Sequence, residues 1–330
     1  MKIIHCSLWG DIEVSDLAIS IIDTAIFQRL HYIKQNGFAY KVFPTATTSR
    51  FSHSIGVYHI TKCFLDFIQM KQPECIVKDT AELICIAGLC HDLGHGPYSH
   101  WFDQLMDTLY EHEHEHDKPE WAHHEKRSTD ILRYIVTENK IEMTSEQVDF
   151  VCSMIVPSSN QWYNTIINNQ CTGIDMDKID YLLRDSQSFG LKMLFDPMRI
   201  IRNSRIIDNH WCFCERVRDE ILTLFHIRNK MYKDIYYHPT IQKFDQCAIQ
   251  LVHRDPEFIL KVKSIIENKK IIDFQKLTDG FIFEMDLFAE MEKRNWGAFT
   301  FQPLRIFNDK QIRLVENVKF YKRKNPDVIM

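Results

Sequence analysis

The sequence predicts a mostly α-helical fold, because apolar residues recur at helical spacing along most of the chain and strand-like alternation is scarce. Breakers are sparse as well, with 10 Gly and 10 Pro among 330 residues. A hydrophobic content of 45% is enough to bury a substantial core. One exception is the segment around Asp208-Asn209, which is flanked by Ile206-Ile207 and Trp211-Cys212-Phe213, so we expect a short β-hairpin near 203–214.

The expected helices follow from this spacing in chain order. Over 15–35 apolar residues such as Leu17, Ile21 and Leu30 recur every three or four positions, and 53–70 repeats the pattern. Residues 80–91 are apolar nearly all round, which predicts a central, buried helix that Gly94 and Gly96 then terminate. Further helices are expected at 123–138, 145–156, 174–188, 196–205, 216–235 and 255–268. We expect a main domain over 1–250, with a small helical or mixed C-terminal lobe over 251–330 packed on it.

Bulk composition narrows the class of protein. The formal net charge of -5 gives no overall basic field of the kind that attracts nucleic acid. The 10 cysteines include no C-x-x-C pair, and Cys85 and Cys90 sit in an apolar segment, which is typical of reduced thiols. With no expected signal peptide or membrane span, an intracellular protein of the cytoplasm or nucleus is predicted. The polar residues 111–120 are expected to form an exposed loop or helix end, and the basic residues after 309 a solvated tail.

The chemistry centres on His91-Asp92, where two ionisable side chains end an otherwise apolar helix. Burying even a neutral polar group without a partner costs roughly 2–7 kcal/mol. For the dipeptide alone, a hydrogen-bonded pair that closes a helix is the more common explanation. His53 upstream and Asp177 downstream change that, because two imidazoles and two carboxylates suit a divalent ion of Fe, Mn, Co, Ni or Zn. Such a site leaves positions for water and a phosphate oxygen.

Polar residues also share one face of the helix expected at 174–188. Asp177, Tyr181 and Asp185 are spaced i, i+4 and i+8, and Lys178 adjoins that face. The face is a poor packing surface and a good wall for a polar ligand, although spacing alone equally allows a solvated face with local salt bridges. His95 and His100 follow the Gly94 break and are candidates to donate protons or to hold phosphate oxygens.

Two longer motifs carry a family resemblance. They are Arg50-Phe51-Ser52-His53-Ser54-Ile55-Gly56-Val57 and Ala87-Gly88-Leu89-Cys90-His91-Asp92-Leu93-Gly94-His95-Gly96-Pro97-Tyr98-Ser99-His100. The chain resembles the HD-domain core of the SAM–HD dNTP triphosphohydrolases from about residue 2 to about residue 300. Members of that family cleave a deoxynucleoside triphosphate into deoxynucleoside and inorganic triphosphate, with water attacking the α-phosphorus. The resemblance implies an HD-domain helical core over 1–250 with a reduced C-terminal lobe.

The resemblance also implies roles for individual residues. Metal ligands are His53, His91, Asp92 and Asp177, holding Fe, Mn, Ni, Co or Zn, while Mg accompanies the triphosphate. Catalytic residues are His95, His100, His124 and Glu125, with His100 close to the leaving 5′-oxygen and the others orienting it or relaying protons. His124 is chosen over His123 because the family pattern is His-Glu followed three residues later by Ser. Substrate-binding residues are Arg50, Lys178 and Arg228 for the triphosphate, Gln35 and Asp185 for the 3′-hydroxyl, Tyr181 and Tyr236 for the sugar, and His238 near the base.

The chain departs from the family pattern in several places. Asn36 replaces a leucine that packs against the sugar, which weakens the expected exclusion of ribonucleotides. Tyr232 replaces a histidine, and both replacements leave another nucleotide substrate open. Activator positions also differ. Asp23 and Gln28 match one guanine-nucleotide site while His31 replaces its arginine, and at the second site Arg199 and Arg294 match while Cys214, Pro239 and Ala298 do not. No SAM domain is expected upstream. We therefore expect weak or absent activation by GTP or dNTP, in a homodimer or homotetramer.

Three functions follow as alternatives. The first is a dNTP triphosphohydrolase. The second is an HD phosphohydrolase acting on another nucleotide, either a ribonucleotide or a cyclic nucleotide. The third is a nucleic-acid-binding or regulatory HD protein, for which single-stranded nucleic acid is the expected partner. The intact catalytic set favours the first.

Overall fold

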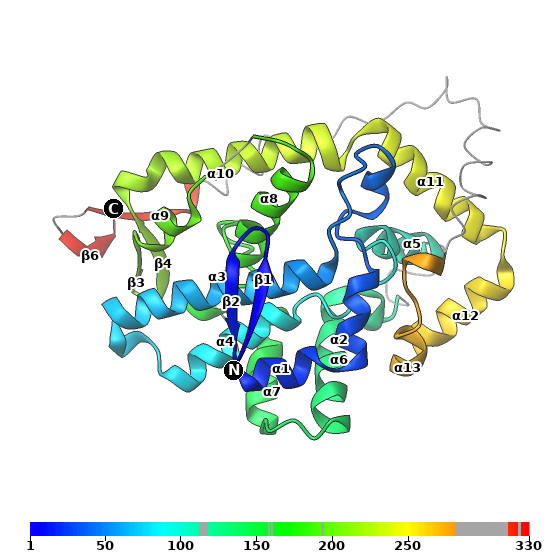
Figure 1. Ribbon diagram of the computed structural model, residues 1–330, viewed down its shortest axis with the longest axis horizontal. Helices are drawn as coiled ribbons and strands as arrows, with labels where there is room; N and C mark the ends of the chain where they lie inside the picture. Colours follow the sequence, from blue (N-terminus) through cyan, green and yellow to red (C-terminus); the bar gives the residue numbers. More distant parts are fainter. Residues whose placement is uncertain are drawn as a thin grey trace.

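The computed structural model describes residues 1–111, 118–157, 159, 161–192, 195–281, 316–322 and 325–329. Helices dominate this part of the chain, which confirms the predicted fold class (Figure 1). The mixed sheet lies at one end of the molecule, and helices α11 to α13 lie at the other. Among the described helices, none combines the length and the apolar character that crossing a membrane requires.

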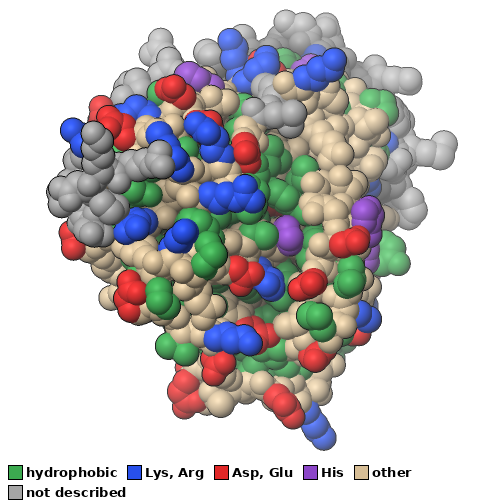
Figure 2. All heavy atoms as spheres, turned by 60° about the vertical axis from the view of Figure 1, so that its left-hand side comes forward, with side chains coloured by type: hydrophobic (Ala, Val, Ile, Leu, Met, Phe, Trp, Pro, Cys, Tyr) green, Lys and Arg blue, Asp and Glu red, His purple; other side chains and the backbone are tan. Residues whose placement is uncertain are grey.

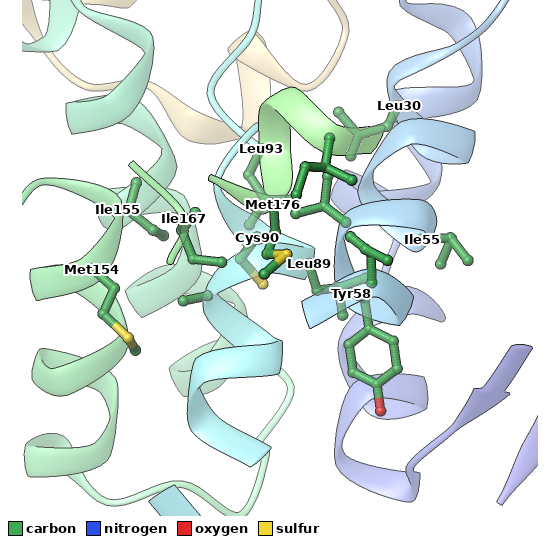
Figure 3. Packing of buried hydrophobic residues seen from close by; sticks show 14 of the residues in the cluster. Leu30, Ile55, Tyr58, Leu89, Cys90, Leu93, Met154, Ile155, Ile167 and Met176 are labelled. Carbon is green, nitrogen blue, oxygen red and sulfur yellow. The ribbon is translucent and has the colours of Figure 1, made fainter. Parts of the chain in front are cut away.

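The core is organised around helix α4 (Lys78–Cys90), as its apolar sequence predicts. Every residue from Leu83 to Cys90 is buried. Helix α3 (Arg50–Lys71) packs along one side of α4, and helix α7 (Ser145–Ile155) packs along the other. Figure 3 shows Leu89 and Cys90 of α4 between Tyr58 of α3 and the α7 residues. This burial on both sides fixes the position where α4 ends, which is where His91-Asp92 follows.

Helices α8 and α10 bring further polar residues to the end of α4. Helix α8 (Met176–Ser188) packs on α3 and begins with Asp175 as its N-cap, whose carboxylate accepts the backbone N–H of Lys178. Helix α3 begins in the same way, with Ser49 accepting from the N–H of Ser52. Helix α10 (Arg218–Met231) contacts α8 and continues into a π-helical turn, Tyr232–Tyr236.

Helix α6 (His124–Glu138) is held close to the end of α4 by a glycine. A Cβ atom built on Gly94 would lie 2.1 Å from the carbonyl oxygen of His124 and 2.6 Å from the backbone nitrogen of Ser128. The Ser128 hydroxyl donates to the carbonyl of His91 at 2.6 Å and accepts from the N–H of Gly94 at 2.8 Å. Glycine at 94 therefore lets the start of α6 lie directly against the His91-Asp92 segment.

The strands form two sheets. The expected hairpin is confirmed as β3 (Ser204–Ile207) and β4 (His210–Cys214), joined by Asp208 and Asn209 with φ angles of 48° and 61°. A second hairpin, β1 (Lys2–Cys6) and β2 (Gly10–Val14), was not predicted. The expectation of a solvated basic tail is wrong for β5 (Lys319–Lys322), which pairs in parallel with β4 and buries Phe320 and Tyr321. Strand β6 (Asn325–Ile329) pairs with β5, and Arg323 and Lys324 lie outside the described residues.

Several helix predictions need correction. A continuous helix over 15–35 is wrong, because α1 (Asp16–Ile22) stops and Thr24 caps a new short helix, α2 (Ala25–Gln28). Helices α5 (His100–Tyr110) and α11 (Pro239–His253) were not expected. Helix α9 (Pro197–Ile201) is shorter than predicted, and α12 (Pro256–Glu267) matches its prediction and precedes α13 (Ile271–Phe274). Residue 250 lies within α11, and the division of the chain at that residue stays a prediction.

The close approach at Gly94 gives a stability prediction. Gly94→Ala should destabilise the fold by about 1–3 kcal/mol, because its Cβ meets backbone atoms that cannot move independently of α6. Gly280→Ala is the matched control, since a Cβ there would meet no atom of the described residues within 4 Å. Urea unfolding followed by circular dichroism measures both variants. Equal midpoints for the two variants would contradict the packing described here.

Candidate active site

The four predicted metal ligands come together where α3, α4 and α8 meet. His53 lies on the first turns of α3, His91 and Asp92 follow the last turn of α4, and Asp177 lies on the first turn of α8. His53 Nε2 lies 3.0 Å from Asp177 Oδ1 and 3.5 Å from Asp92 Oδ2. His91 Nε2 lies 3.3 Å from Asp92 Oδ1 and 3.6 Å from Asp177 Oδ1. Each imidazole therefore faces both carboxylates.

The hydrogen bond of His91 leaves its Nε2 atom for a cation. His91 Nδ1 lies 2.8 Å from the carbonyl oxygen of Gly88, which can only accept, so Nδ1 carries the proton. His91 Nε2 then has a lone pair, and it is buried without a hydrogen-bond partner among the described residues. The lone pair of His91 Nε2 faces the carboxylates of Asp92 and Asp177, and a cation among these three groups would compensate their negative charge. These residues fit a divalent metal ion.

The ionisation of the site supports the same conclusion. Burial favours the neutral acid, but Arg50, His91 and His95 hold the pKa of Asp92 well below its usual range. Burial lowers the pKa of His53, but hydrogen bonds to Asp177 and Asp180 outweigh it and raise that pKa to about 9. The carboxylates are thus ionised, and they attract positive charge to the point that the His53 ring faces.

A cavity of about 540 Å³ opens from this centre. Its size falls in the range of small-molecule sites. The predicted site residues line it with two exceptions, His53 and His238. His53 is fully buried beneath the cavity wall. His238 caps α11 instead, with its Nδ1 accepting from the N–H of Thr240, and its ring lies 5.8 Å from that of Phe43. Its predicted place near the base is therefore not supported by the lining of the cavity.

Three cations predicted to hold a triphosphate line the cavity, and they differ in their partners. Arg50 Nη1 donates to Asp92 Oδ2 at 2.6 Å, and Lys178 Nζ donates to Asp175 Oδ2 at 2.6 Å. Arg228 differs, because its Nε and Nη1 are buried without a hydrogen-bond partner in the described part of the chain. Leaving charged donors buried and unpaired is costly. Arg228 is accordingly the cation most available to an anionic ligand.

Another part of the cavity lining carries the residues predicted to bind the sugar. Asp185 Oδ1 accepts from Asn36 Nδ2 at 2.8 Å, and Asp185 Oδ2 accepts from the hydroxyl of Tyr236 at 2.7 Å. Burial raises the pKa of Asp185 to about 6, although these two hydrogen bonds lower it. Gln35 Oε1 is buried with no hydrogen-bond partner among described residues. This wall therefore offers acceptors, which suits a ligand with hydroxyl groups.

Three histidines predicted to be catalytic form a cluster around a residue that sequence reasoning missed, Asp103. Asp103 Oδ2 lies 2.9 Å from His124 Nδ1, 3.3 Å from His100 Nδ1 and 3.9 Å from His95 Nδ1. Burial lowers the pKa of His124, but Asp103 outweighs it and the net shift is upward. Burial, Arg50 and His124 hold the pKa of His95 well below its usual value. The pKa values of these two neighbouring imidazoles are thus shifted in opposite directions. Glu125 joins this cluster through His124 Nε2, 3.6 Å away.

Asp180 was also missed. It lies one helical turn after Asp177, and its Oδ2 accepts from His53 Nδ1 at 2.8 Å. Trp9 Nε1 donates to its other oxygen at 2.6 Å, and Arg184 binds both oxygens at 2.8 Å. A carboxylate in this position orients the ring so that Nε2 faces Asp177 and Asp92, where a metal would bind. The i, i+3 spacing from Asp177 was the available signal for Asp180, as it was from His100 for Asp103.

Three residues that match the family's activator positions contact other residues of this chain. Asp23 pairs with Lys2 at 3.2 Å, Gln28 Nε2 donates to the carbonyl of Ile22 at 2.8 Å, and the ring of His31 stacks on Phe51 at 3.6 Å. Arg294 and Ala298 lie outside the described residues, as does 112–117 of the acidic, histidine-rich segment.

Helix ends that present two histidines and two carboxylates over a polar cavity define the HD type of metal site. Residues 50–185, which contain all four ligands, match the model of the HD domain. The chain therefore contains an HD domain, whose conserved chemistry requires a divalent metal.

The chain is a homologue of proteins named deoxynucleoside triphosphate triphosphohydrolase SAMHD1. It is 34% identical over 297 residues to the SAMHD1 homolog of Dictyostelium discoideum, covering 88% of this chain and 56% of that protein. It is 32% identical over 327 residues to the Homo sapiens protein, covering 86% and 50%. Identity is 36% over 304 residues to the putative HD domain-containing protein L394 of Acanthamoeba polyphaga mimivirus, covering 86% and 64%. The chain thus spans between half and two thirds of these relatives.

Metal binding can be tested through one ligand. His91→Ala should weaken binding of Mn²⁺ by more than about 100-fold, because it removes the unpartnered Nε2 from the centre. Asp66→Asn, an exposed carboxylate on α3 paired with Lys62, is the control and should leave the affinity unchanged. Isothermal titration after chelation of resident metal measures both. Equal affinities in the two variants would place the ion elsewhere.

The buried carboxylate of Asp185 gives a pH-dependent prediction. Its folded pKa of about 6 exceeds the ordinary 3.8, so its burial destabilises the fold fully above pH 6 and not at all below pH 3.8. Asp185→Asn should therefore raise the free energy of unfolding at pH 8, by at most roughly 3 kcal/mol. The gain should shrink as the pH falls toward 4. Exposed Asp149→Asn should change stability by less than about 1 kcal/mol at either pH. A pH-independent gain would refute the assignment.

Proposed function

We propose that the protein is a metal-dependent dNTP triphosphohydrolase, which converts a dNTP and water into a deoxynucleoside and inorganic triphosphate. The observation that carries the proposal is that three features share the lining of one cavity. They are the metal centre, the Arg228 guanidinium, whose Nε and Nη1 have no partner among the described residues, and the wall with Asp185, and they would bind the α-phosphate, the polyphosphate and the sugar. The names of the relatives support the same substrate class.

The metal would be held by His53, His91, Asp92 and Asp177, and Fe, Mn, Ni, Co or Zn all suit these ligands. When bound, such an ion supplies Lewis acidity, which stabilises negative charge on phosphoryl oxygens and makes water a better nucleophile. Arg228 would bind the triphosphate, with Mg²⁺ neutralising further charge. Arg50 and Lys178 would contribute positive potential while keeping their bonds to Asp92 and Asp175.

The histidine cluster would supply the proton for the leaving 5′-oxygen. The upward shift of the His124 pKa beside Asp103 favours the charged form of that ring, and the same Asp103 oxygen accepts from His100. The His100 side chain is 68% exposed, so it is the member of the cluster that a substrate can reach. Asp103 is a positioning residue here, since it fixes the Nδ1 side of both rings and leaves Nε2 of His100 to face the substrate. Glu125 would orient His124.

A second candidate substrate, a ribonucleotide, has one observation in its favour. Asn36 Nδ2 donates to Asp185 beside the predicted sugar site. The Oδ1 atom of the same amide is an acceptor that suits a 2′-hydroxyl. The nucleic-acid-binding alternative finds less support. Acidic and basic side chains are interspersed on the face shown in Figure 2, which is not the extended basic surface that such binding needs.

Activation by nucleotide is a separate part of the proposal. His31 stacks on Phe51 and Asp23 pairs with Lys2, so these side chains are held by contacts within the chain. We propose that hydrolysis does not depend on GTP and that the active form is a homodimer or homotetramer assembled without it.

Product analysis tests the reaction. The protein with Mn²⁺ is incubated with each dNTP and NTP, with and without GTP, and products are resolved by ion-pair chromatography. We expect deoxynucleoside and intact triphosphate from dNTPs, at a rate that GTP does not change. Release of monophosphate and pyrophosphate, or of inorganic phosphate alone, would contradict the proposal. So would cleavage of no nucleotide by protein that holds the metal.

Arg228 gives the corresponding mutational prediction. Arg228→Ala should lower kcat/KM for a dNTP by about 10- to 100-fold, because a charged hydrogen bond to the polyphosphate is lost. Lys230→Ala lies on the same helix, exposed and paired with Asp234, and should retain the wild-type value. Steady-state kinetics measures both variants. An unchanged kcat/KM in Arg228→Ala would show that the triphosphate lies elsewhere in the cavity.

A further inference from the structure

One buried carboxyl in the cavity lining has no part in the proposed reaction. Asp245 lies on α11, is 7% exposed and lines the cavity that opens from the metal centre. Its carboxylate accepts a single hydrogen bond from the described residues, which comes from Gln242 Nε2 over a long 3.4 Å. Buried polar groups normally have closer partners than this. A ligand in the cavity can supply the missing donors.

The charge of Asp245 is also uncompensated. No Lys, Arg or His of the described chain forms an ion pair with it, and burial alone raises its pKa to about 7. Above that pH the group is an ionised carboxylate with two acceptor oxygens. A carboxylate that lines a ligand-sized cavity without a compensating cation is a candidate for contact with a ligand that donates hydrogen bonds.

Side chains that follow Arg228 along the chain continue the cavity lining away from the predicted triphosphate site. Tyr232 and Tyr236 come four and eight residues after Arg228, and all three line the cavity. The guanidinium carbon of Arg228 lies 5.7 Å from the centroid of the Tyr232 ring, and that ring lies 5.1 Å from the ring of Tyr236. The stripe therefore leads from the available cation to the residues predicted to bind the sugar.

Tyr236 connects the sugar wall to Asp245. Its hydroxyl donates to Asp185 Oδ2 at 2.7 Å, and its backbone carbonyl accepts from Gln242 Nε2 at 3.3 Å. The same Gln242 nitrogen is the one that approaches Asp245. A nucleotide with its polyphosphate at Arg228 and a sugar hydroxyl at Asp185 would thus extend along Tyr236 and place its base beside Gln242 and Asp245.

Apolar side chains surround this end of the cavity. Trp101 is 3% exposed and its Nε1 donates to the backbone carbonyl of Asp245 at 3.0 Å, which joins α5 to α11. Ile241 lies one helical turn before Asp245, and Tyr237 lies at the end of the π-helical turn. These three side chains also line the cavity. A flat heterocycle needs such apolar surface for its faces and a polar group for its edge.

We propose that Asp245, oriented by Gln242, binds the edge of the nucleobase and selects guanine. This inference rests on the proposed function, which places a nucleotide in the cavity. Guanine presents two adjacent donors, N1–H and the 2-amino group, which match the two oxygens of a carboxylate. Adenine and cytosine each have an acceptor next to the amino group, and thymine has acceptors on both sides of its single donor. Those acceptors would face the carboxylate oxygens without a proton between them.

The proposal is tested first with the unsubstituted full chain and deoxynucleosides, which are bound without being hydrolysed. Saturation-transfer NMR at pH 8 measures the affinities of deoxyguanosine, deoxyinosine and deoxyadenosine. We expect deoxyguanosine to bind at least about 10-fold more tightly than deoxyadenosine. Deoxyinosine, which keeps N1–H and lacks the 2-amino group, should lie between them. Equal affinities for the three nucleosides would overturn the proposal.

Variants then assign the preference to the carboxylate. Asp245→Asn replaces two acceptors with one acceptor and one donor, which match the amino group and N1 of adenine, so the preference should change to deoxyadenosine. Gln242→Leu, at a half-buried position, should reduce the guanine preference without reversing it, because the orienting amide is lost. Asp66→Asn, the exposed α3 carboxylate paired with Lys62, is the control and should keep the wild-type ratio. A guanine preference that survives in Asp245→Asn would overturn the assignment.

Hydrolysis provides a separate measurement. The ratio of kcat/KM for dGTP to that for dATP should exceed about 10 in the unsubstituted protein and fall below 1 in Asp245→Asn. A purely structural role of Asp245 would lower both values and leave their ratio unchanged. Hydrolysis of dNTPs with the same ratio in both proteins would overturn the base site and leave the reaction standing. A reversed nucleoside preference without any hydrolysis would support the base site and overturn the reaction instead.

Discussion

The burial of Asp92 and His91 at the end of the apolar helix α4 is the constraint on which the rest of the site depends. Two carboxylates and two imidazoles share one buried point, and their own hydrogen bonds direct lone pairs and negative charge at it. Arg50 compensates part of that charge, and a dication compensates the remainder. The neighbouring features follow from this need. Gly94 lets α6 approach, Asp180 orients His53, and α8 is capped so that Asp177 lies on its first turn.

The same arrangement separates the cavity into regions of different chemistry. Arg228 has donors without partners among the described residues, the Asp185 wall has acceptors, and the Asp103 cluster has imidazoles whose pKa values are shifted in opposite directions. A nucleoside triphosphate has the complementary sequence of polyphosphate, phosphorus and hydroxylated sugar.

Much of this could be predicted from the sequence, and the failures have identifiable causes. The spacing of apolar residues predicted α4, α6, α7 and α8 because these helices are long and bury one face or all faces. It failed over 15–35, where Thr24 caps a new helix inside a periodic segment. The tail was misjudged because Phe320 and Tyr321 have no buried environment until β5 pairs with β4, a contact between residues about 100 positions apart. Asp103 and Asp180 were missed because their roles depend on rings contributed by other helices.

Anomalous X-ray scattering from crystals grown with Mn²⁺, collected on either side of the manganese absorption edge, tests whether these four side chains hold the metal. We expect a strong anomalous peak within bonding distance of His53 Nε2, His91 Nε2, Asp92 and Asp177. We also expect that His91 Nδ1 stays bonded to the carbonyl of Gly88. A manganese-saturated crystal with no peak among these four side chains would contradict the account, because the buried carboxylates would then be satisfied without a metal.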